Sequence, residues 1–270
     1  MSLRAHVAAG AAVIERDVRI FLSYRFRAVT LFVAPLASVT LFYYVSRLVR
    51  VDAIGSSDGY FAYVVIGIVG LDVLASTLAL TPTAVRQELV AGTFERLVVS
   101  PFGAASSIVA MLAFPVAQAL VVAVGTIAFS AAAFGVAIAW PGILLAGPAG
   151  VLAALAFAPL GLLVVAALLV IKQTLSAVAL VLTAFSIVAG AYFPIQLLPD
   201  WIEWVSDVQP LTPALDLLRE LATATPSHGT SPWLSAAKLV GFTALLLPLS
   251  LWCLGRAISH SRSRGTITEY

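Results

Sequence analysis

Residues 142–171 read GILLAGPAGVLAALAFAPLGLLVVAALLVI, thirty residues without one charged side chain. A helix needs roughly 20 mostly apolar residues to cross the hydrocarbon core of a bilayer, so this segment is long enough to span a membrane. Pro148 and Pro159 lie inside it, and we expect a kink, a tilt or a break there. The segment therefore predicts a helical membrane protein.

The composition of the whole chain agrees with this prediction. Of its 270 residues, 61% are hydrophobic and 10% are charged, whereas soluble domains carry about 25% charged residues. The net charge of +2 is too weak to suggest a nucleic-acid partner. The single cysteine, Cys253, excludes an intramolecular disulfide and a cysteine metal cluster. Lipid is therefore the main solvent and partner of this chain.

Six windows are long and apolar enough to span the membrane, and the third also contains a proline, Pro115. The windows are Ala28–Leu48, Tyr60–Leu80, Ala104–Phe134, Gly142–Ile171, Gln173–Ala191 and Trp233–Arg256. We predict an all-α polytopic membrane protein with a cytoplasmic N-terminus (1–27), a six-helix transmembrane domain (28–256) and a cytoplasmic tail (257–270). Residues 1–27 carry charges throughout and lack the short apolar core of a signal peptide, so we expect the N-terminus to be retained.

The distribution of basic residues predicts the orientation, because cytoplasmic loops are enriched in Lys and Arg. With both termini in the cytoplasm, eleven of the fifteen basic residues lie on that side. They are Arg4, Arg16, Arg19, Arg25, Arg27, Arg86, Arg96, Lys172, Arg256, Arg262 and Arg264. We therefore expect a multi-pass protein of the plasma membrane with both termini cytoplasmic.

The N-terminal segment Val7–Arg25 has the pattern of an amphipathic helix. Val7, Ala11, Ile14, Val18 and Phe21 share one helical face, and Glu15, Arg16, Arg19 and Ser23 share the other. Glu15 and Arg19 form a favourable i,i+4 pair. The segment predicts a helix in the cytoplasmic interface, which serves either as a membrane anchor or as a docking surface for a partner.

Residues 82–101 read PTAVRQELVAGTFERLVVSP and form the one sizeable cytoplasmic loop between the predicted spans. Charged and apolar residues alternate in it, and Gly92 divides it into two short helical pieces. Helices this short are marginal in water, so we expect the loop to pack on something. The alternative is a tight turn that rests on the bilayer.

Residues 194–232 form the predicted external segment before the last span. Trp201, Trp204 and Tyr192 suit the membrane–water interface. Ile195–Pro199 is too hydrophobic for an ordinary aqueous loop. The segment therefore predicts a short re-entrant or interfacial hairpin that dips back into the outer leaflet.

Catalytic patterns are absent from the sequence. The three histidines lie in termini or loops, and there is no Gly-x-x-x-x-Gly-Lys-Ser/Thr loop to hold ATP. Asp72 is the one acid well inside a predicted span, and such a residue is a candidate functional site. It is either a proton or cation site or a neutral, hydrogen-bonded aspartate at a helix seam, with Ser76 one turn away. We predict a protein that is not an enzyme.

Two motifs resemble a known family. The cytoplasmic loop contains Glu88, then Gly92-Thr93-Phe94-Glu95-Arg96-Leu97, then Ser100-Pro101. The external segment contains Phe193-Pro194, Leu198-Pro199, Trp201, Pro210 and Leu217–Arg219. Over the whole chain, this arrangement resembles ABC-2 type transporter permeases, the membrane subunits of a class of ATP-binding-cassette exporters.

The resemblance implies partners and site residues. Two permease subunits, identical or different, would pair with two copies of a separate ATPase subunit, which would bind the ATP and magnesium, so this chain would need no cofactor. Coupling to the ATPase would use Glu88, Gly92, Thr93, Phe94, Glu95, Arg96, Leu97, Ser100 and Pro101, with a second contact at Lys172. Among these, Glu88, Glu95 and Arg96 would be polar contacts, and Phe94 and Leu97 apolar anchors.

The resemblance also implies a substrate path between the second and fifth spans and an external gate. The candidate lining residues are Asp72, Ser76, Thr77, Thr183, Phe185 and Ser186, and the candidate gate residues are Phe193, Pro194, Leu198, Pro199 and Trp201. The expected activity is ATP-driven export of a hydrophobic or amphipathic substrate, such as a drug or lipid. The alternatives are export of a lipid-linked polysaccharide and ion-gradient-driven transport through Asp72. A membrane scaffold would not explain the motif-bearing loop.

Overall fold

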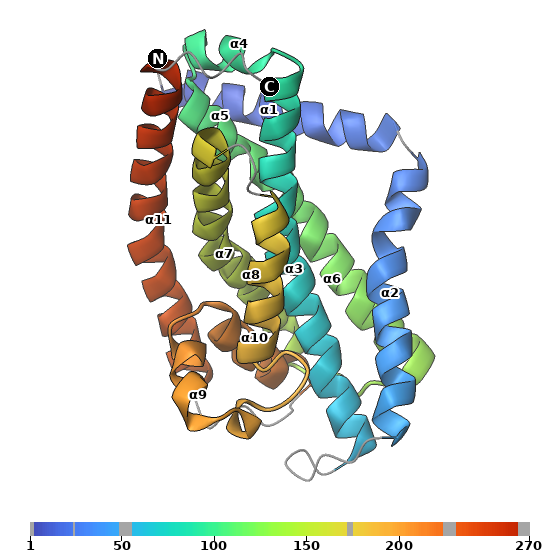
Figure 1. The fold of residues 1–270 in the computed structure, drawn as a ribbon. Coiled ribbons are helices and arrows are strands. Elements are labelled where there is room, and N and C mark those ends of the chain that lie inside the picture. The colour runs from blue at the N-terminus through green and yellow to red at the C-terminus, as the bar shows by residue number, and fades with distance from the viewer. Residues whose placement is uncertain (1–2, 24, 49–55, 172–174, 224–230, 264–270) are drawn as a thin grey trace.

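The computed structural model describes residues 3–23, 25–48, 56–171, 175–223 and 231–263, and helices are the regular structure within these ranges. The all-α class is therefore confirmed. The first helix, α1 (Leu3–Ser23), lies across one end of a bundle of long helices (Figure 1). It covers most of the segment that was predicted to form an amphipathic helix.

Within the described residues, five helical segments are long and apolar enough to cross a membrane. They are α2 (Arg25–Leu48), α3 (Ser57–Val90), α5 and α6 (Ala104–Met111 and Ala113–Phe134), α7 (Ile143–Ile171) and α11 (Pro232–Ser263). The fifth predicted window, Gln173–Ala191, contains α8 (Leu175–Val188), whose 14 residues extend about 21 Å, less than the hydrocarbon thickness of about 30 Å. A sixth crossing stays a prediction.

Helix α3 is the longest element, with 34 residues and a length of about 50 Å. The predicted span ended at Leu80, but the helix continues through Pro82 to Val90. The first of the two short helical pieces expected in the loop is therefore the end of α3. Helix α3 packs against α2, α6, α7, α8 and α10, so the proline lies in a helix that neighbours hold on several sides.

Prolines affect the third and fourth spans differently. The third span breaks at Leu112, between α5 and α6, and Pro115 lies in the first turn of α6, where a missing N–H is tolerated. By contrast, α7 continues through Pro148 and Pro159 without a break. The expected interruption is thus confirmed in the third span, whereas the fourth stays one helix.

The chain after α8 forms a short 3₁₀ turn, η1 (Ile195–Leu197), and two helices, α9 (Asp200–Asp207) and α10 (Leu211–Ala222). Helix α10 is buried against α3, α7 and α11, whereas α9 exposes Trp201 and Trp204. The two helices form a helical hairpin before the last span, and its buried arm is α10 rather than residues 195–199. Helix α4 (Phe94–Val99) and the α9–α10 hairpin lie at opposite ends of the bundle (Figure 1), and we refer to these as the α4 end and the α10 end.

Glycines bring α3 into close backbone contact with its neighbours. A Cβ atom at Gly161 of α7 would lie 2.6 Å from the carbonyl oxygen of Thr77 on α3. A Cβ atom at Gly67 of α3 would lie 1.9 Å from the carbonyl oxygen of Ala191. Helices in lipid associate through such small residues, because the apolar solvent gives little reason to bury apolar side chains.

We expect Gly161→Ala to lower the free energy of unfolding by about 1–3 kcal/mol, because the added methyl group would push α7 away from α3. The matched control on the same helix is Gly147→Ala, since a Cβ at Gly147 meets nothing within 4 Å. The control should be neutral or slightly stabilising, as alanine favours helix over glycine. Thermal unfolding of the purified variants in detergent measures both effects. Equal unfolding temperatures would contradict this packing.

Candidate functional site

A glycine turn separates α3 from α4. Gly92 has a φ of 69°, a left-handed conformation that glycine adopts without strain. Its N–H donates to the carbonyl of Leu89 (3.1 Å), and the N–H of Thr93 donates to the carbonyl of Glu88 (3.0 Å). These two bonds form a Schellman motif, which satisfies the last carbonyls of α3. Gly92 therefore stops α3 at a defined residue and turns the chain into α4.

The second turn of the loop follows from Ser100 and Pro101. The residue before a proline is held in an extended conformation, and Ser100 has φ −66° and ψ 148°, so α4 ends there. The Ser100 hydroxyl donates to the carbonyl of Leu97 (3.0 Å) and accepts from the N–H of Gly103 (3.2 Å). With a φ of 82°, Gly103 then starts α5. The two glycine turns fix α4 as a rigid elbow, and we call residues 88–103 the elbow.

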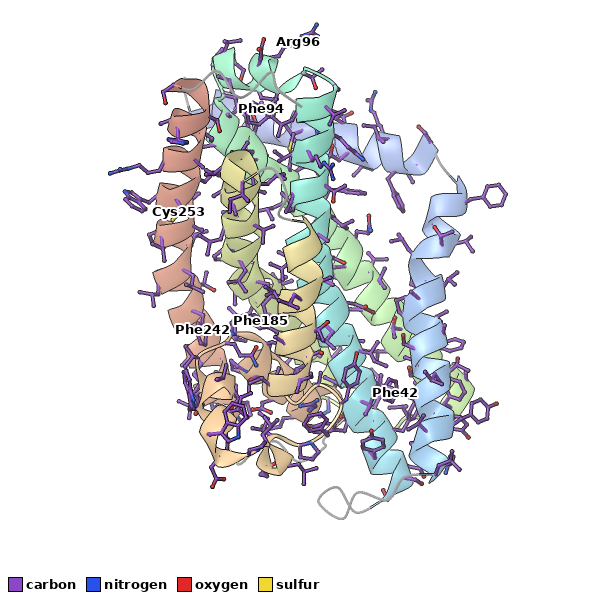
Figure 2. All side chains as sticks on the ribbon, viewed as in Figure 1. Phe42, Phe94, Arg96, Phe185, Phe242 and Cys253 are labelled. Carbon is purple, nitrogen blue, oxygen red and sulfur yellow. The ribbon has the colours of Figure 1, made fainter. Side chains whose placement is uncertain are left out.

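The side chains of α4 divide into a buried and an exposed face. Phe94 is 1% exposed and packs in a core cluster with Val85 of α3 and Leu162 of α7. Leu97 is half-buried against the same cluster. Glu95 and Arg96 are exposed, and Figure 2 shows Arg96 pointing away from the bundle. Phe94 was expected as an apolar anchor for a partner, but here it anchors α4 to its own chain.

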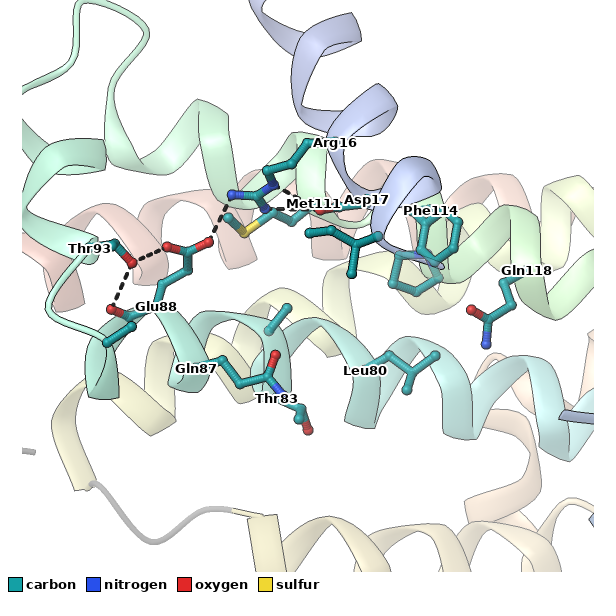
Figure 3. Close-up of a pocket in the computed structure, with 14 residues that line it drawn as sticks. Arg16, Asp17, Leu80, Thr83, Gln87, Glu88, Thr93, Met111, Phe114 and Gln118 are labelled. Carbon is teal, nitrogen blue, oxygen red and sulfur yellow. Dashed lines mark hydrogen bonds and ion pairs between the residues drawn. The ribbon is translucent and has the colours of Figure 1, made fainter. Parts of the chain in front are cut away.

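An ion-pair cluster ties α1 to the elbow (Figure 3). The carboxylate of Glu88 accepts a hydrogen bond from Arg16 of α1 (2.8 Å) and another from the hydroxyl of Thr93. Arg16 also pairs with Asp17 (3.0 Å). Glu88 was expected to be a contact for a partner, whereas here its carboxylate holds α1, α3 and the start of α4 together.

Helix α1 itself presents two faces. Val7 is 67% exposed, and Ile14 and Val18 of the same apolar face are also exposed. The predicted pair between Glu15 and Arg19 is present (2.5 Å). An exposed apolar face opposite a face that binds Glu88 suits a helix that lies on lipid, which favours the interpretation of α1 as an anchor. The second expected coupling residue, Lys172, lies outside the described residues.

The candidate path residues are not all brought together. Thr77 is fully buried, donates to the carbonyl of Val73 (2.8 Å) and faces Gly161 of α7. It therefore lies in the seam between α3 and α7, and its place in a substrate path stays a prediction. Thr183 and Ser186 lie on α8 and donate to carbonyls of their own helix. Phe185 packs against the central core cluster.

Asp72 of α3 is half-buried, and Ser76 one turn away is half-buried too. Its Oδ2 atom is buried and has no hydrogen-bond partner within the described residues, so the suggested bond to Ser76 does not form through this oxygen. Tyr192, just beyond α8, lies close enough to Asp72 to interact electrostatically with its carboxylate. Burial raises the pKa of the Tyr192 phenol, and the Asp72 carboxylate raises it further. Asp72 thus faces the end of α8.

A buried arginine organises the α10 end. Arg219 of α10 is 0% exposed, and its guanidinium lies 3.4 Å from the centre of the Tyr63 ring on α3. Its Nη2 atom donates to the carbonyls of Gly190 (2.8 Å) and Ala191 (3.3 Å), just after α8. The hydroxyl of Tyr63 also donates to the Gly190 carbonyl (2.8 Å). One side chain therefore joins α10, α3 and the end of α8.

The expected gate residues lie on either side of this joint. Phe193 is half-buried, and its carbonyl accepts a hydrogen bond from Tyr63 (3.3 Å), while Pro194 is buried. Leu198 is half-buried, and Pro199 and Trp201 are exposed. The first part of the segment is therefore fixed to α3, and the second part lies on the surface next to α9.

The sequence placed Arg16 on the polar face of an amphipathic helix without a partner, gave no role to Tyr63 and placed Arg219 in the external segment. A signal for Arg219 was present, because the apolar residues of Leu211–Ala222 recur at helical spacing around it. An arginine inside such a pattern indicates a paired, buried charge. The pairing of Arg16 with Glu88 joins residues 72 positions apart, and neither motif spacing nor periodicity indicates it.

Together, these features define a polytopic helical membrane protein with a rigid, exposed elbow at the end of one long helix. Comparison with known families matches residues 11–222 to the ABC-2 type transporter family, and the chain belongs to this family of transporter permeases. It is also similar to Nodulation protein J of Sinorhizobium fredii (strain NBRC 101917 / NGR234). The two chains are 27% identical over 201 residues, which cover 73% of this chain and 76% of that protein.

We expect Arg219→Ala to lower the free energy of unfolding by about 3 kcal/mol or more. The substitution would remove the guanidinium donor from the buried carbonyls of Gly190 and Ala191, and Gly190 would keep the hydrogen bond from the Tyr63 hydroxyl. Arg219→Lys should also destabilise, because a single ammonium group cannot reproduce the flat fork of donors. Thermal unfolding in detergent measures both variants.

Arg47→Ala is the matched control. Arg47 also lies over a tyrosine, Tyr43 (5.0 Å), and pairs with Asp58 (3.2 Å), but its side chain is 46% exposed. Exposed pairs contribute about 0–1 kcal/mol, so this change should be nearly neutral. A similar loss of stability in both alanine variants would contradict the role of burial at Arg219.

Proposed function

We propose that this chain is the transmembrane subunit of an ATP-driven exporter and that a separate ATPase subunit binds the elbow. The observation that carries the proposal is the continuity of α3. One unbroken helix of about 50 Å connects the exposed α4 with Asp72 and the joint at Tyr63. A push on α4 reaches the other end of the bundle as a rigid-body movement.

The exposed charges of α4 suit a partner surface. Glu95 and Arg96 project from a helix that buried Phe94 holds in place, so binding would require little ordering of the chain. The sequence contains no phosphate-binding loop, so the nucleotide and its magnesium belong to the partner. In this arrangement the α4 end faces the cytoplasm, in agreement with the distribution of Lys and Arg.

The remaining architecture follows from the same proposal. The predicted window Gln173–Ala191, which contains α8, makes the sixth crossing. The α9–α10 hairpin re-enters the outer leaflet and forms the external gate. A second permease subunit, of the same or a related sequence, completes the path along α3 and α8. The apolar character of the spans suits an amphipathic cargo such as a drug or lipid, with a lipid-linked polysaccharide as the alternative.

We expect the double change Glu95→Ala and Arg96→Ala to weaken ATPase binding by roughly tenfold or more, since truncated charged anchors at interface centres commonly have such effects. Co-purification with the partner ATPase, and the ATP hydrolysis that the chain stimulates in it, measure the loss of binding. The matched control is Glu203→Ala, on exposed α9 at the α10 end. Unchanged binding and export in the double variant would refute the proposal.

The second candidate is ion-gradient transport through Asp72, and the unpartnered Oδ2 atom is the observation in its favour. No group of three or more metal-binding side chains surrounds it within the described residues. We expect Asp72→Asn to keep ATP-dependent export within about twofold, because an amide of the same shape retains the packing. Vesicle uptake driven by a proton or sodium gradient without ATP, and lost in Asp72→Asn, would establish the second candidate instead.

A further inference from the structure

A cavity of about 500 Å³ lies under α1 at the α4 end, between α1, α3 and the break that separates α5 from α6 (Figure 3). Its lining is mixed. Leu80, Met111 and Phe114 supply apolar surface, and Arg16, Glu88 and Gln118 are among its polar residues. We call it the α1 cavity. Its size lies within the range of small-molecule sites.

Gln118 is the residue whose unpaired polar atom points to a ligand in the cavity. It lies in α6, a segment otherwise made of apolar and small residues, and its Oε1 atom is buried without a hydrogen-bond partner within the described residues. A buried acceptor left unpaired costs about 1–3 kcal/mol. Because Gln118 lines the cavity, a group that enters the cavity can supply the missing donor.

The charges of the cavity indicate which donor fits. Among the described residues, its one basic side chain, Arg16, is already paired with Asp17 (3.0 Å) and Glu88 (2.8 Å). Two carboxylates and one guanidinium leave the lining with a net charge of −1. An anionic head would meet a cation that is already paired and two negative groups. A protonated amine would meet carboxylate and amide oxygens, all of which are acceptors.

Resting on the proposed export function, we propose that the α1 cavity is the loading site for the substrate and that the substrate is an amphiphile with a protonated amine. The amine donates to the Oε1 atom of Gln118, and the apolar part of the ligand contacts Leu80 and Phe114. Glu88 lines the same cavity and holds Arg16 and Thr93. A ligand in the cavity therefore lies directly against the ion pair that fixes the elbow, which links loading to the surface that binds the ATPase.

The test measures binding to the purified chain in lipid nanodiscs without the ATPase, so it does not depend on transport. Dodecylamine, dodecanol and dodecyl sulfate share one hydrocarbon tail and differ in the head group. Calorimetric titration, with empty nanodiscs as the reference, separates binding from partition into lipid. We expect saturable binding of dodecylamine and none of dodecyl sulfate. Gln118→Leu should weaken the binding of dodecylamine about tenfold, the effect of one hydrogen bond to a charged group.

Two further variants keep the test decisive. Gln196→Leu, exposed at the opposite end of the bundle, should bind dodecylamine as the wild type does. Gln118→Glu replaces the amide that faces the amine with a carboxylate and should bind dodecylamine more tightly. A misfolded variant would not show such a gain in affinity. Equal affinity in the wild type and both Gln118 variants, or dodecyl sulfate binding as tightly as dodecylamine, would overturn the proposal. If dodecylamine binds as expected but no ATPase co-purifies with the chain, the proposed export function is refuted and the α1 cavity remains a binding site.

Discussion

Close contact between backbones holds this helix bundle together, because a chain dissolved in hydrocarbon gains little from burying apolar side chains. The contacts converge on α3, where Gly67 admits the carbonyl of Ala191 and where Gly161 of α7 admits the carbonyl of Thr77. Helix α3 also contacts α2, α6, α8 and α10. Its position therefore sets the position of nearly every other element. The elbow is held in the same way, since the Gly92 turn attaches α4 directly to the end of α3.

Hydropathy predicted the long apolar helices of the fold but not where α3 and α8 end. Five long apolar segments appear where the sequence indicates them. The end of α3 was taken for a loop, because residues 82–90 carry charges and a proline while tertiary contacts keep them helical. Helix α8 is shorter than its window, since the helix ends at Val188 and Gly190 adopts a φ of 68°. Apolar character alone does not distinguish a helix from the apolar turn that follows it.

The candidate site was predictable where local chain geometry demands particular residues. Gly92, Ser100 and Pro101 could be singled out because each determines a backbone conformation that few other residues adopt. The roles of the side chains were harder to predict, because they depend on segments distant in sequence. Phe94 and Glu88 have the character of exposed contacts in the motif, yet α7 covers one and α1 binds the other. Arg219 looked like a charge on a loop because hydropathy does not register carbonyls supplied by residues 190 and 191.

The two ends of α3 differ in how firmly they are held. At the α4 end, Arg16 and Glu88 form a partly solvated pair, and such pairs contribute up to about 1 kcal/mol. At the α10 end, releasing Arg219 would strand a charge and two carbonyls away from water, which costs several kcal/mol. Under the proposed export function, force at α4 would therefore tilt α3 about its firmly held end at α10. Helix α9 is joined to α11 by the exposed pair of Asp207 and Lys238 (2.9 Å). Less free energy is therefore needed to detach α9 than to detach α10. We propose that the outer opening forms when α9 moves away from α10, while α10 stays on α3.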